Sequence, residues 1–263
     1  MNEFRLDPER LDFTLVGSKN DGCYACSIKS QEVAAIPFGN GFIRSYEIKN
    51  DIQPSKYELN GGVYKSSNAH GYQEIMIENA EHKDKIKSYS AEQLNVLIDS
   101  FMKRAGELSR HKLGDNLLIT RYLGGHGYTE LSILPVPKLV KSTCFECAAA
   151  ASVQNRELIS SENFIAFSPF APRFEEEIQI LPRKHLDLLS MDPVMTFDLA
   201  GILKKIIGAI GDDSTMSIIQ SGGSHLKVLF GKSNLTPYSI IGINKIYNSP
   251  EEYVKSLKAK INV

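Results

Sequence analysis

Four cysteines form two Cys-x-x-Cys pairs, a spacing at which two thiolates can bind one metal ion. The pairs are Cys23/Cys26 and Cys144/Cys147. The first ten residues carry charges of both signs and no apolar signal segment, so we expect a cytoplasmic protein, in which disulfides are disfavoured. The two pairs therefore favour zinc binding, and redox-active or free thiols are the alternative.

Histidines follow each cysteine pair in the same order. A strand-like run after each pair ends in a histidine, and a later Gly-Gly segment carries a second one. This internal repeat predicts two quartets of zinc ligands, which are Cys23, Cys26, His82, His126 and Cys144, Cys147, His185, His225. Four protein ligands leave no open coordination position, so we expect both zinc ions to be structural.

The segments between these ligands have the patterns of helices and strands. Ser90 and Gln93 form a capping-box pattern before an apolar stripe, a second helix opens at Asp192, and a third is expected from Ser249. Runs rich in Ile, Leu, Val and Phe predict strands. These runs lie at 74–82, 116–123, 163–170, 177–185, 217–220 and 240–247.

Length and composition allow one large domain or two modest ones. The chain has 263 residues, of which 42% are hydrophobic, and the strand and helix patterns predict the α+β class. We expect two antiparallel-sheet halves with packed helices, at 1–138 and 139–263. Thirty basic against thirty-one acidic residues give a net charge of -1, which argues against a nucleic-acid or membrane partner. The oligomeric state is left open, with a homodimer as one arrangement.

The ordered set of motifs resembles the galactose-1-phosphate uridylyltransferase family, which carries two histidine-triad folds in one chain. The similar segments are 4–8 (FRLDP), the first cysteine pair, 61–78, 79–82 (NAEH) and 164–185, and the resemblance extends over about residues 4 to 257. It implies a pseudo-dimer of two HIT-like halves, and uridylyl transfer between a UDP-sugar and a hexose 1-phosphate. It supports the first zinc site more than the second, because the family's second half often lacks the cysteine pair.

The family's nucleophile is the second histidine of a His-Pro-His-x-Gln motif, and neither half of this chain has it. A closing Leu-Pro aligns residues 126–135 with the family's strand. His126 then takes the place of the zinc-binding histidine, Tyr128 that of the nucleophile, and Glu130 that of the glutamine. The corresponding triplet of the second half is His225-Leu226-Lys227.

Tyr128 and Glu130 are therefore the catalytic candidates. A phenol has a pKa of about 10 and needs a base to act as a nucleophile. Glu130 lies on the same face of a strand and could accept the proton. A carboxylate also repels phosphate, so the alternative is a tyrosine that packs into the vacated site. Candidates for substrate contacts are Arg173, Lys184 and His70, each of which also fits an exposed position.

Three functions remain compatible with these residues. The first is a nucleotidyltransferase of the uridylyltransferase type with altered chemistry. The second is a protein that binds a nucleotide or nucleotide-sugar without catalysis, and the third is a structural or interaction protein. The resemblance favours the first, whereas the missing nucleophile favours the second.

Overall fold

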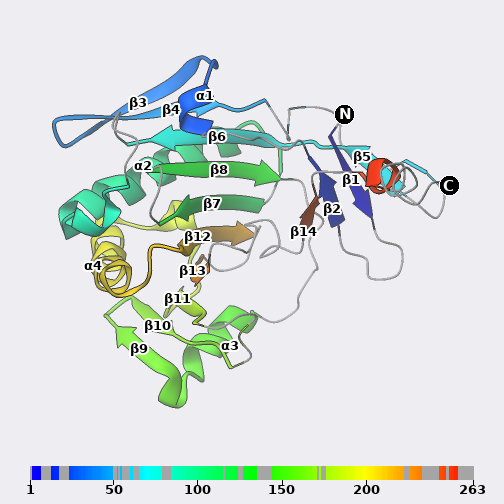
Figure 1. Ribbon diagram of the computed structural model, residues 1–263. Helices are drawn as coiled ribbons and strands as arrows, with labels where there is room; N and C mark the ends of the chain where they lie inside the picture. Colours follow the sequence, from blue (N-terminus) through cyan, green and yellow to red (C-terminus); the bar gives the residue numbers. More distant parts are fainter. Residues whose placement is uncertain are drawn as a thin grey trace.

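The computed structural model is built around one ten-stranded antiparallel sheet (Figure 1). It describes residues 2–6, 13–17, 24–49, 52, 54, 60–61, 65–78, 84–114, 116–123, 127–134, 144–170, 172, 176–221, 226–232, 243–246 and 249–253. The strands of the large sheet are β3 (Glu32–Phe38), β4 (Gly41–Glu47), β6 (Tyr72–Ile77), β7 (Asn116–Tyr122), β8 (Tyr128–Leu134), β9 (Glu157–Ser160), β10 (Phe164–Phe167), β11 (Ile178–Pro182), β12 (Ser214–Ser221) and β13 (Lys227–Lys232). Their order is β3-β4-β6-β8-β7-β12-β13-β11-β10-β9.

The two halves of the chain supply the two sides of this sheet. Read outward from the centre, β7, β8, β6, β4 and β3 mirror β12, β13, β11, β10 and β9, an order that matches the internal repeat. The α+β class is confirmed. The two halves pair with each other as expected, and antiparallel pairing of β7 with β12 joins their strands into one sheet. The boundary near residue 138 lies outside the described residues and stays a prediction.

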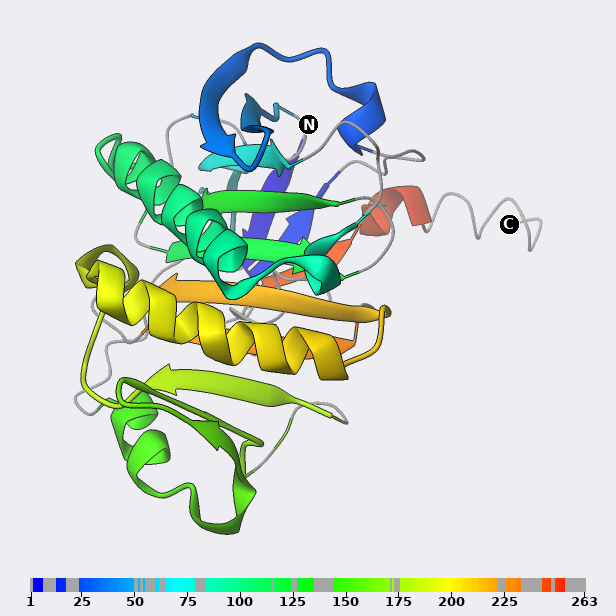
Figure 2. The same ribbon diagram turned by 90° about the vertical axis from the view of Figure 1, so that its left-hand side faces the viewer.

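Two long helices cover one face of the large sheet. α2 (Ala91–Ser109) lies over the first half and α4 (Pro193–Ala209) over the second (Figure 2). Both begin where the sequence predicts. Ser90 and Gln93 make the two reciprocal bonds of a capping box, and the Asp192 side chain accepts a hydrogen bond from the amide of Met195. Apolar side chains from both helices and the sheet form one core that spans the two halves.

The capping box at Ser90 allows a simple test of where α2 begins. Ser90→Ala should lower the free energy of unfolding by about 1 kcal/mol, because alanine cannot accept the bond from the Gln93 amide. That amide lies 3.2 Å from Ser90 Oγ. Urea denaturation followed by circular dichroism measures the change. Ser90→Thr keeps the hydroxyl and is the matched control, so an equal loss in both variants would contradict the cap.

A smaller four-stranded sheet packs on the other face of the large sheet. Its strands are β1 (Glu3–Leu6), β2 (Phe13–Val16), β5 (Lys65–Asn68) and β14 (Ile243–Ile246), in the order β14-β2-β1-β5. Their apolar residues pack against Leu118, Leu134 and Ile219 of the large sheet. The predicted strand at 240–247 thus contains β14, but the sequence analysis did not predict a second sheet.

Short helical elements complete the described structure. They are α1 (Tyr24–Ser27), η1 (Ile86–Ser88), α3 (Phe145–Ala151), η2 (Gln154–Arg156) and η3 (Leu188–Ser190). Residues 250–253 form a helical turn in which Ser249 and Glu252 make both bonds of the predicted capping box. Within the described ranges, no helix combines the length and the apolar character needed to cross a membrane.

Candidate functional site

Side chains of the large sheet alternate between its two faces. Ile119 of β7 points into the core beneath α2 and α4. Its neighbour Leu118 points the other way, as does Leu134 of β8. We call this second side, which is turned away from α2 and α4, the back face. By the same alternation Tyr128 and Glu130 share the back face with Leu134, as the sequence predicts.

Six residues of the back face form a patch on three neighbouring strands. We call it the central patch, and it consists of Tyr128 and Glu130 from β8, Thr120 and Tyr122 from β7, and Thr215 and Ser217 from β12. Thr120 is paired with Glu130 on one side and with Ser217 on the other. Tyr122 is paired with Thr215, and its ring centroid lies 6.5 Å from that of Tyr128. The central patch therefore combines two phenol rings, three aliphatic hydroxyls and one carboxylate, with no basic side chain.

The three aliphatic hydroxyls of the central patch are buried. Thr120, Thr215 and Ser217 are 1%, 3% and 0% exposed. None of the three hydroxyl oxygens has a hydrogen-bond partner among the residues that the structure describes. A buried polar group without a partner costs about 1–3 kcal/mol, and nearly all such groups in proteins are bonded. Three of them on one face are an unusual concentration of buried hydroxyls without a partner in the described structure.

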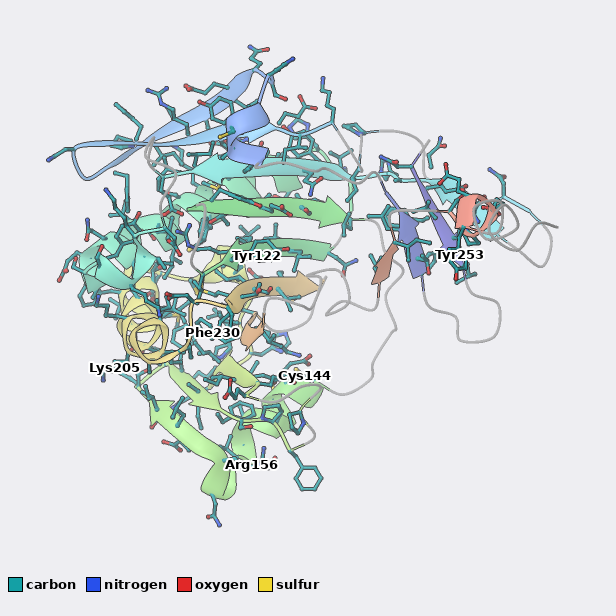
Figure 3. The ribbon with its side chains drawn as sticks, viewed as in Figure 1. Tyr122, Cys144, Arg156, Lys205, Phe230 and Tyr253 are labelled. Atoms are coloured by element: carbon teal, nitrogen blue, oxygen red, sulfur yellow. The ribbon has the colours of Figure 1, made fainter. Side chains whose placement is uncertain are left out.

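Tyr128 stands first on β8, with its side chain half-buried. It is paired with Ile77 and packs at an interplanar angle of 56° against the ring of Tyr122, which Figure 3 labels. Glu130 is also half-buried and lies about 7 Å further along the strand. This arrangement allows two roles. Glu130 could take a proton from the phenol, or the two tyrosine rings could form an aromatic surface for a ligand.

The second predicted quartet is partly assembled in the structure. Cys144, Cys147 and His185 each place one ligand atom within 4.8 Å of the other two. Cys144 caps α3, where its Sγ accepts a hydrogen bond of 3.5 Å from the Cys147 amide (Figure 3). His185 follows β11, and its Nδ1 lies 3.8 Å from Cys147 Sγ. The fourth predicted ligand, His225, lies outside the described residues.

The geometry of these three residues fits a zinc ion. Zinc bonds of about 2.3 Å to sulfur and about 2.0 Å to nitrogen, at a tetrahedral angle, separate the two donor atoms by about 3.6 Å. The observed separation of 3.8 Å between Cys147 Sγ and His185 Nδ1 is close to this value. The hydrogen bond from the Cys147 amide to Cys144 Sγ is of the kind that orients a metal ligand. Cys144, Cys147 and His185 can therefore hold a metal ion.

The alternative of a redox-active pair receives less support. Burial, followed by the hydrogen bond and the charge of Cys144, raises the pKa of the Cys147 thiol above its ordinary value. A reactive cysteine needs the opposite shift, because the thiolate is the nucleophile. Lys227 does not reverse this shift, because its Nζ lies 3.4 Å from a Glu146 carboxylate oxygen. The ion-free pair is thus a poor redox centre.

The first predicted quartet is represented by one residue. Cys26 is exposed at α1, whereas Cys23, His82 and His126 lie outside the described residues. The first zinc site therefore stays a prediction. The resemblance supports the first zinc site more than the second. The positions of the described residues, however, provide evidence only about the second site.

The structure places two of the predicted substrate-contact residues, His70 and Lys184, away from Tyr128. His70 lies next to Gly71, whose Cα approaches Ile133 and Leu134 at the opposite end of β8. That end is roughly 20 Å from Tyr128 along the strand. Lys184 is exposed after β11, and three strands separate β11 from β8. Arg173 lies outside the described residues, so its role stays a prediction.

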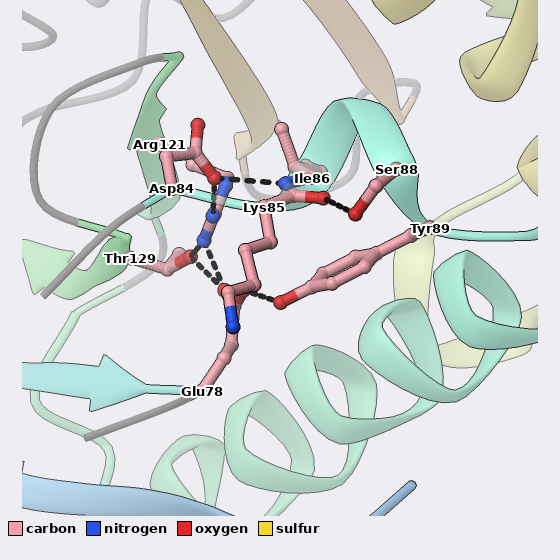
Figure 4. Close-up of polar contacts among 8 residues, drawn as sticks. All are labelled: Glu78, Asp84, Lys85, Ile86, Ser88, Tyr89, Arg121 and Thr129. Carbon is pink, nitrogen blue, oxygen red and sulfur yellow. Dashed lines mark hydrogen bonds and ion pairs between the residues drawn. The ribbon is translucent and has the colours of Figure 1, made fainter. Parts of the chain in front are cut away.

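A buried ionic network lies beneath the central patch, on the helix side of the sheet (Figure 4). Arg121 of β7 is 0% exposed and forms ion pairs with Glu78 and Asp84. Thr129, the residue between Tyr128 and Glu130, lies 3.3 Å from the Arg121 guanidinium. Tyr89 donates a hydrogen bond of 3.0 Å to Glu78. The network fixes β7, β8 and the chain before α2 to one another.

The sequence analysis missed this network. One feature of the sequence could have indicated it, namely the single arginine in the apolar run NLLITRYL. A charged residue in such a run is either exposed or paired with an opposite charge. Another buried carboxylate, Glu177, lies just before β11. It is 1% exposed and accepts a hydrogen bond of 2.8 Å from Gln179.

Two curated proteins match the chain at low identity, whereas no protein-family model matches it. Galactose-1-phosphate uridylyltransferase from Thermotoga maritima is 22% identical over 199 residues, which are 67% of this chain and 61% of that protein. ADP-glucose phosphorylase from Arabidopsis thaliana is 21% identical over 183 residues, which are 62% of this chain and 52% of that protein. The matched region thus covers less than two thirds of each relative. These matches confirm the resemblance drawn from the motifs as a distant one, at 22% and 21% sequence identity.

Solved structures show the same fold. A uridylyltransferase structure superposes with a TM-score of 0.69 at 17% identity, covering 88% of this chain and 86% of that chain. A structure of ADP-glucose phosphorylase from Arabidopsis thaliana with bound ADP-glucose superposes with a TM-score of 0.62 at 18% identity, covering 97% of both chains. The α+β architecture with its large antiparallel sheet is therefore shared.

Proposed function

We propose that this chain, a distant relative of the galactose-1-phosphate uridylyltransferases with their fold, binds a nucleotide or nucleotide-sugar on the back face without forming a histidine-linked nucleotidyl intermediate. The observation that carries the proposal is the central patch. It contains Tyr128, which the motif resemblance aligns with the family's nucleophile, beside a second aromatic ring and a row of three buried hydroxyls. These groups suit binding, and none of them is a strong nucleophile near neutral pH.

The comparisons support a nucleotide-sugar as the ligand class. One relative of the same fold has ADP-glucose bound in its structure, and the two curated relatives are named for reactions of sugar phosphates or nucleotide-sugars. Binding measurements with uridine and adenine nucleotide-sugars identify the base and the sugar.

Zinc would have a structural role in this protein. Cys144, Cys147 and His185 would hold one ion, with His225 as the predicted fourth ligand. A zinc ion with four protein ligands would cross-link the chain and would leave no coordination position open to water or substrate. Its cross-link would fasten the start of α3 to the turn after β11, next to the small apolar cluster in which Ala149 and Ala150 of α3 pack with Leu181 of β11. The first quartet, with Cys23, Cys26, His82 and His126, is proposed to hold a second ion.

A second candidate function is nucleotidyl transfer through Tyr128. The position of Glu130 on the same face favours it, since the carboxylate could accept the phenolic proton. In this step the phenolic oxygen would bond to the α-phosphorus, and the bond from phosphorus to the leaving phosphate would break. The charge of Glu130 opposes the step, because a carboxylate next to the reacting phosphate destabilises the extra negative charge.

Binding and chemistry can be separated with one set of ligands. We expect calorimetry to detect binding of UDP-glucose or ADP-glucose. Incubation with α-labelled UDP-glucose and galactose 1-phosphate should give no labelled protein and no exchange. Tyr128→Phe should change the affinity by at most about tenfold, the value of one neutral hydrogen bond.

Two results would contradict this proposal in different ways. Label on the wild-type protein that disappears in Tyr128→Phe would establish the second candidate. No heat of binding with UMP, AMP, UDP-glucose or ADP-glucose would leave a structural or interaction protein. Tyr128→His restores the family's residue, and it tests whether the surrounding groups still support transfer.

A further inference from the structure

We infer that the outer face of α4 is an interface between two copies of this chain, which pack α4 against α4 about a two-fold axis at Gly201. This face lies on the opposite side of the sheet from the central patch, so the interface goes beyond the proposed function and does not depend on it. Three features carry it, which are the apolar outer face of α4, the glycines in that face, and a knob and a hole that fit each other.

The outer faces of α2 and α4 differ, although the internal repeat places both helices on the same side of the sheet (Figure 2). The exposed positions of α2 are mainly charged, as at Glu92, Asp99 and Lys103. On α4, Val194 and Phe197 are 70% and 49% exposed. A helix that is apolar on its outer side as well as its inner side is normally covered on both. Since both helices have the same place in their half, the fold of a half does not require this difference.

Two glycines continue the outer face of α4 beyond Phe197. Gly201 and Gly208 follow it at helical spacing on the same side of the helix. Apart from the neighbouring helix backbone, no atom of the described chain lies within 4 Å of the place where a Cβ would stand at either glycine. Glycine is unfavourable inside a helix, and its usual benefit is the close approach of another backbone. The packing of the described chain does not use this benefit, whereas a second helix on this face would.

The outer face of α4 contains both a knob and a hole of matching size. Phe197 is the knob, and Gly201, Lys204, Lys205 and Gly208 have the spacing of the four residues that surround one hole in helix packing. Because two of these four are glycines, the hole has room for a phenyl ring. When a second copy packs antiparallel about a two-fold axis at Gly201, Phe197 of each copy lies opposite the hole of the other. The face is therefore complementary to itself.

The charges of α4 suit the same arrangement. Lys205 is exposed on the side of α4 that is turned away from the sheet, where Figure 3 labels it. A lysine can lay its aliphatic stem along an apolar surface, and its ammonium is attracted to the face of an aromatic ring such as Phe197. The one carboxylate of α4, Asp198, is held within the chain by hydrogen bonds of 2.8 Å from Ser161 and 3.0 Å from Asn163. The pairing thus buries no carboxylate without a partner.

The two edges of the large sheet are less suited to binding a second copy. Val33 of the edge strand β3 and Leu158 of the edge strand β9 are each an extra residue at a break in register. β3 also contains Pro37, which has no amide hydrogen to donate. Such irregularities protect a sheet edge from the addition of another strand. The second copy is therefore expected at α4.

The interface can be tested by analytical ultracentrifugation over a range of protein concentrations. We expect a reversible dimer with a dissociation constant in about the micromolar range, because one helix pair is a small interface. Phe197→Glu should raise this constant at least about 100-fold, which is about tenfold for each of its two copies. Val96→Glu places the same charge on the outer face of α2, where Val96 is 36% exposed. This matched control should leave the dimer unchanged.

Substitutions at the glycines locate the two-fold axis. Gly201→Leu should abolish the dimer by filling the crossing point, and the melting temperature of the dilute protein should stay unchanged or rise, because leucine favours a helix. Gly201→Cys places two thiols across the axis at a distance that a disulfide can span, so mild oxidation should link the two copies. Gly208→Cys is the matched control, since its two copies would lie roughly 21 Å apart along the antiparallel helices. It should give no more cross-linking than the native cysteines of the wild type.

Three results would overturn the interface. A wild-type protein that stays monomeric up to millimolar concentration would show that a second copy does not cover this face. A dimer that both Phe197→Glu and Gly201→Leu keep would use another surface. Cross-linking through Gly208→Cys and not through Gly201→Cys would contradict the two-fold axis at Gly201. None of these measurements involves a nucleotide, so they leave the proposed function to its own test.

Discussion

Arg121→Leu should lower the free energy of unfolding by about 3–5 kcal/mol, the cost of leaving buried charges without their partner. The guanidinium is the counter-ion of both Glu78 and Asp84, and these carboxylates are 0% and 4% exposed. Leucine fills much of the space but neutralises neither charge. Urea denaturation at pH 7 measures the loss.

A surface pair gives the matched control for Arg121. Arg44 and Glu32 also form an ion pair, but their side chains are 48% and 36% exposed. Arg44→Leu should therefore cost no more than about 1 kcal/mol. Equal losses in the two arginine variants would contradict the structural role of the buried network.

The loss in Arg121→Leu should also depend on pH. Burial raises the pKa of Glu78 above its ordinary value, and the charge of Arg121 opposes this shift. Without Arg121 the pKa in the folded state rises further above that of the unfolded chain. The folded variant then takes up a proton as the pH falls, so its deficit relative to the wild type should be smaller at pH 5 than at pH 8. A deficit that is constant over this range would argue against an unpaired carboxylate.

Cys147→Ser should remove one equivalent of zinc from the purified protein and lower its stability. The serine hydroxyl is a poor zinc ligand, and the remaining Cys144 and His185 cannot complete a tetrahedral site. If free zinc exceeds the dissociation constant by about a thousandfold, the lost stabilisation is about 4 kcal/mol. Elemental analysis gives the zinc content and thermal unfolding gives the stability.

The other cysteine pair supplies the comparison for this experiment. Cys26→Ser addresses the first predicted quartet, so it should also remove one equivalent, and the double variant should hold none. Chelation of the wild type should reproduce the double variant. A wild-type protein without zinc, in which Cys144 and Cys147 oxidise to a disulfide, would instead establish the redox alternative.

Local signals made much of the fold predictable. Ser90, Asp192 and Ser249 mark the starts of their helices because a cap depends only on residues a few positions apart. The internal repeat predicted two similar halves for a comparable reason, since each half repeats its own local pattern, and the mirrored strand order agrees with it. The small sheet was not predictable in this way. Its strands have four residues each, and β14 pairs with β2 from the other end of the chain.

The candidate site was predictable where alternation along one strand decides it. Tyr128 and Glu130 share a face because they are two residues apart, and no knowledge of the partner strands is needed. The rest of the central patch depends on register. Thr120 meets Ser217 only through the pairing of β7 with β12, which joins residues almost a hundred positions apart. The same holds for Arg121, whose partners come from before α2.

The pairing of β7 with β12 has a consequence for how this chain can exist. Each of the two strands would be the outermost strand of its own half if the halves were apart, and each would then expose a long row of free amide and carbonyl groups beside apolar side chains. An exposed strand edge of this kind promotes self-association. A polypeptide containing a single half would therefore need a second copy of itself at that edge, and the covalent duplication supplies this copy permanently.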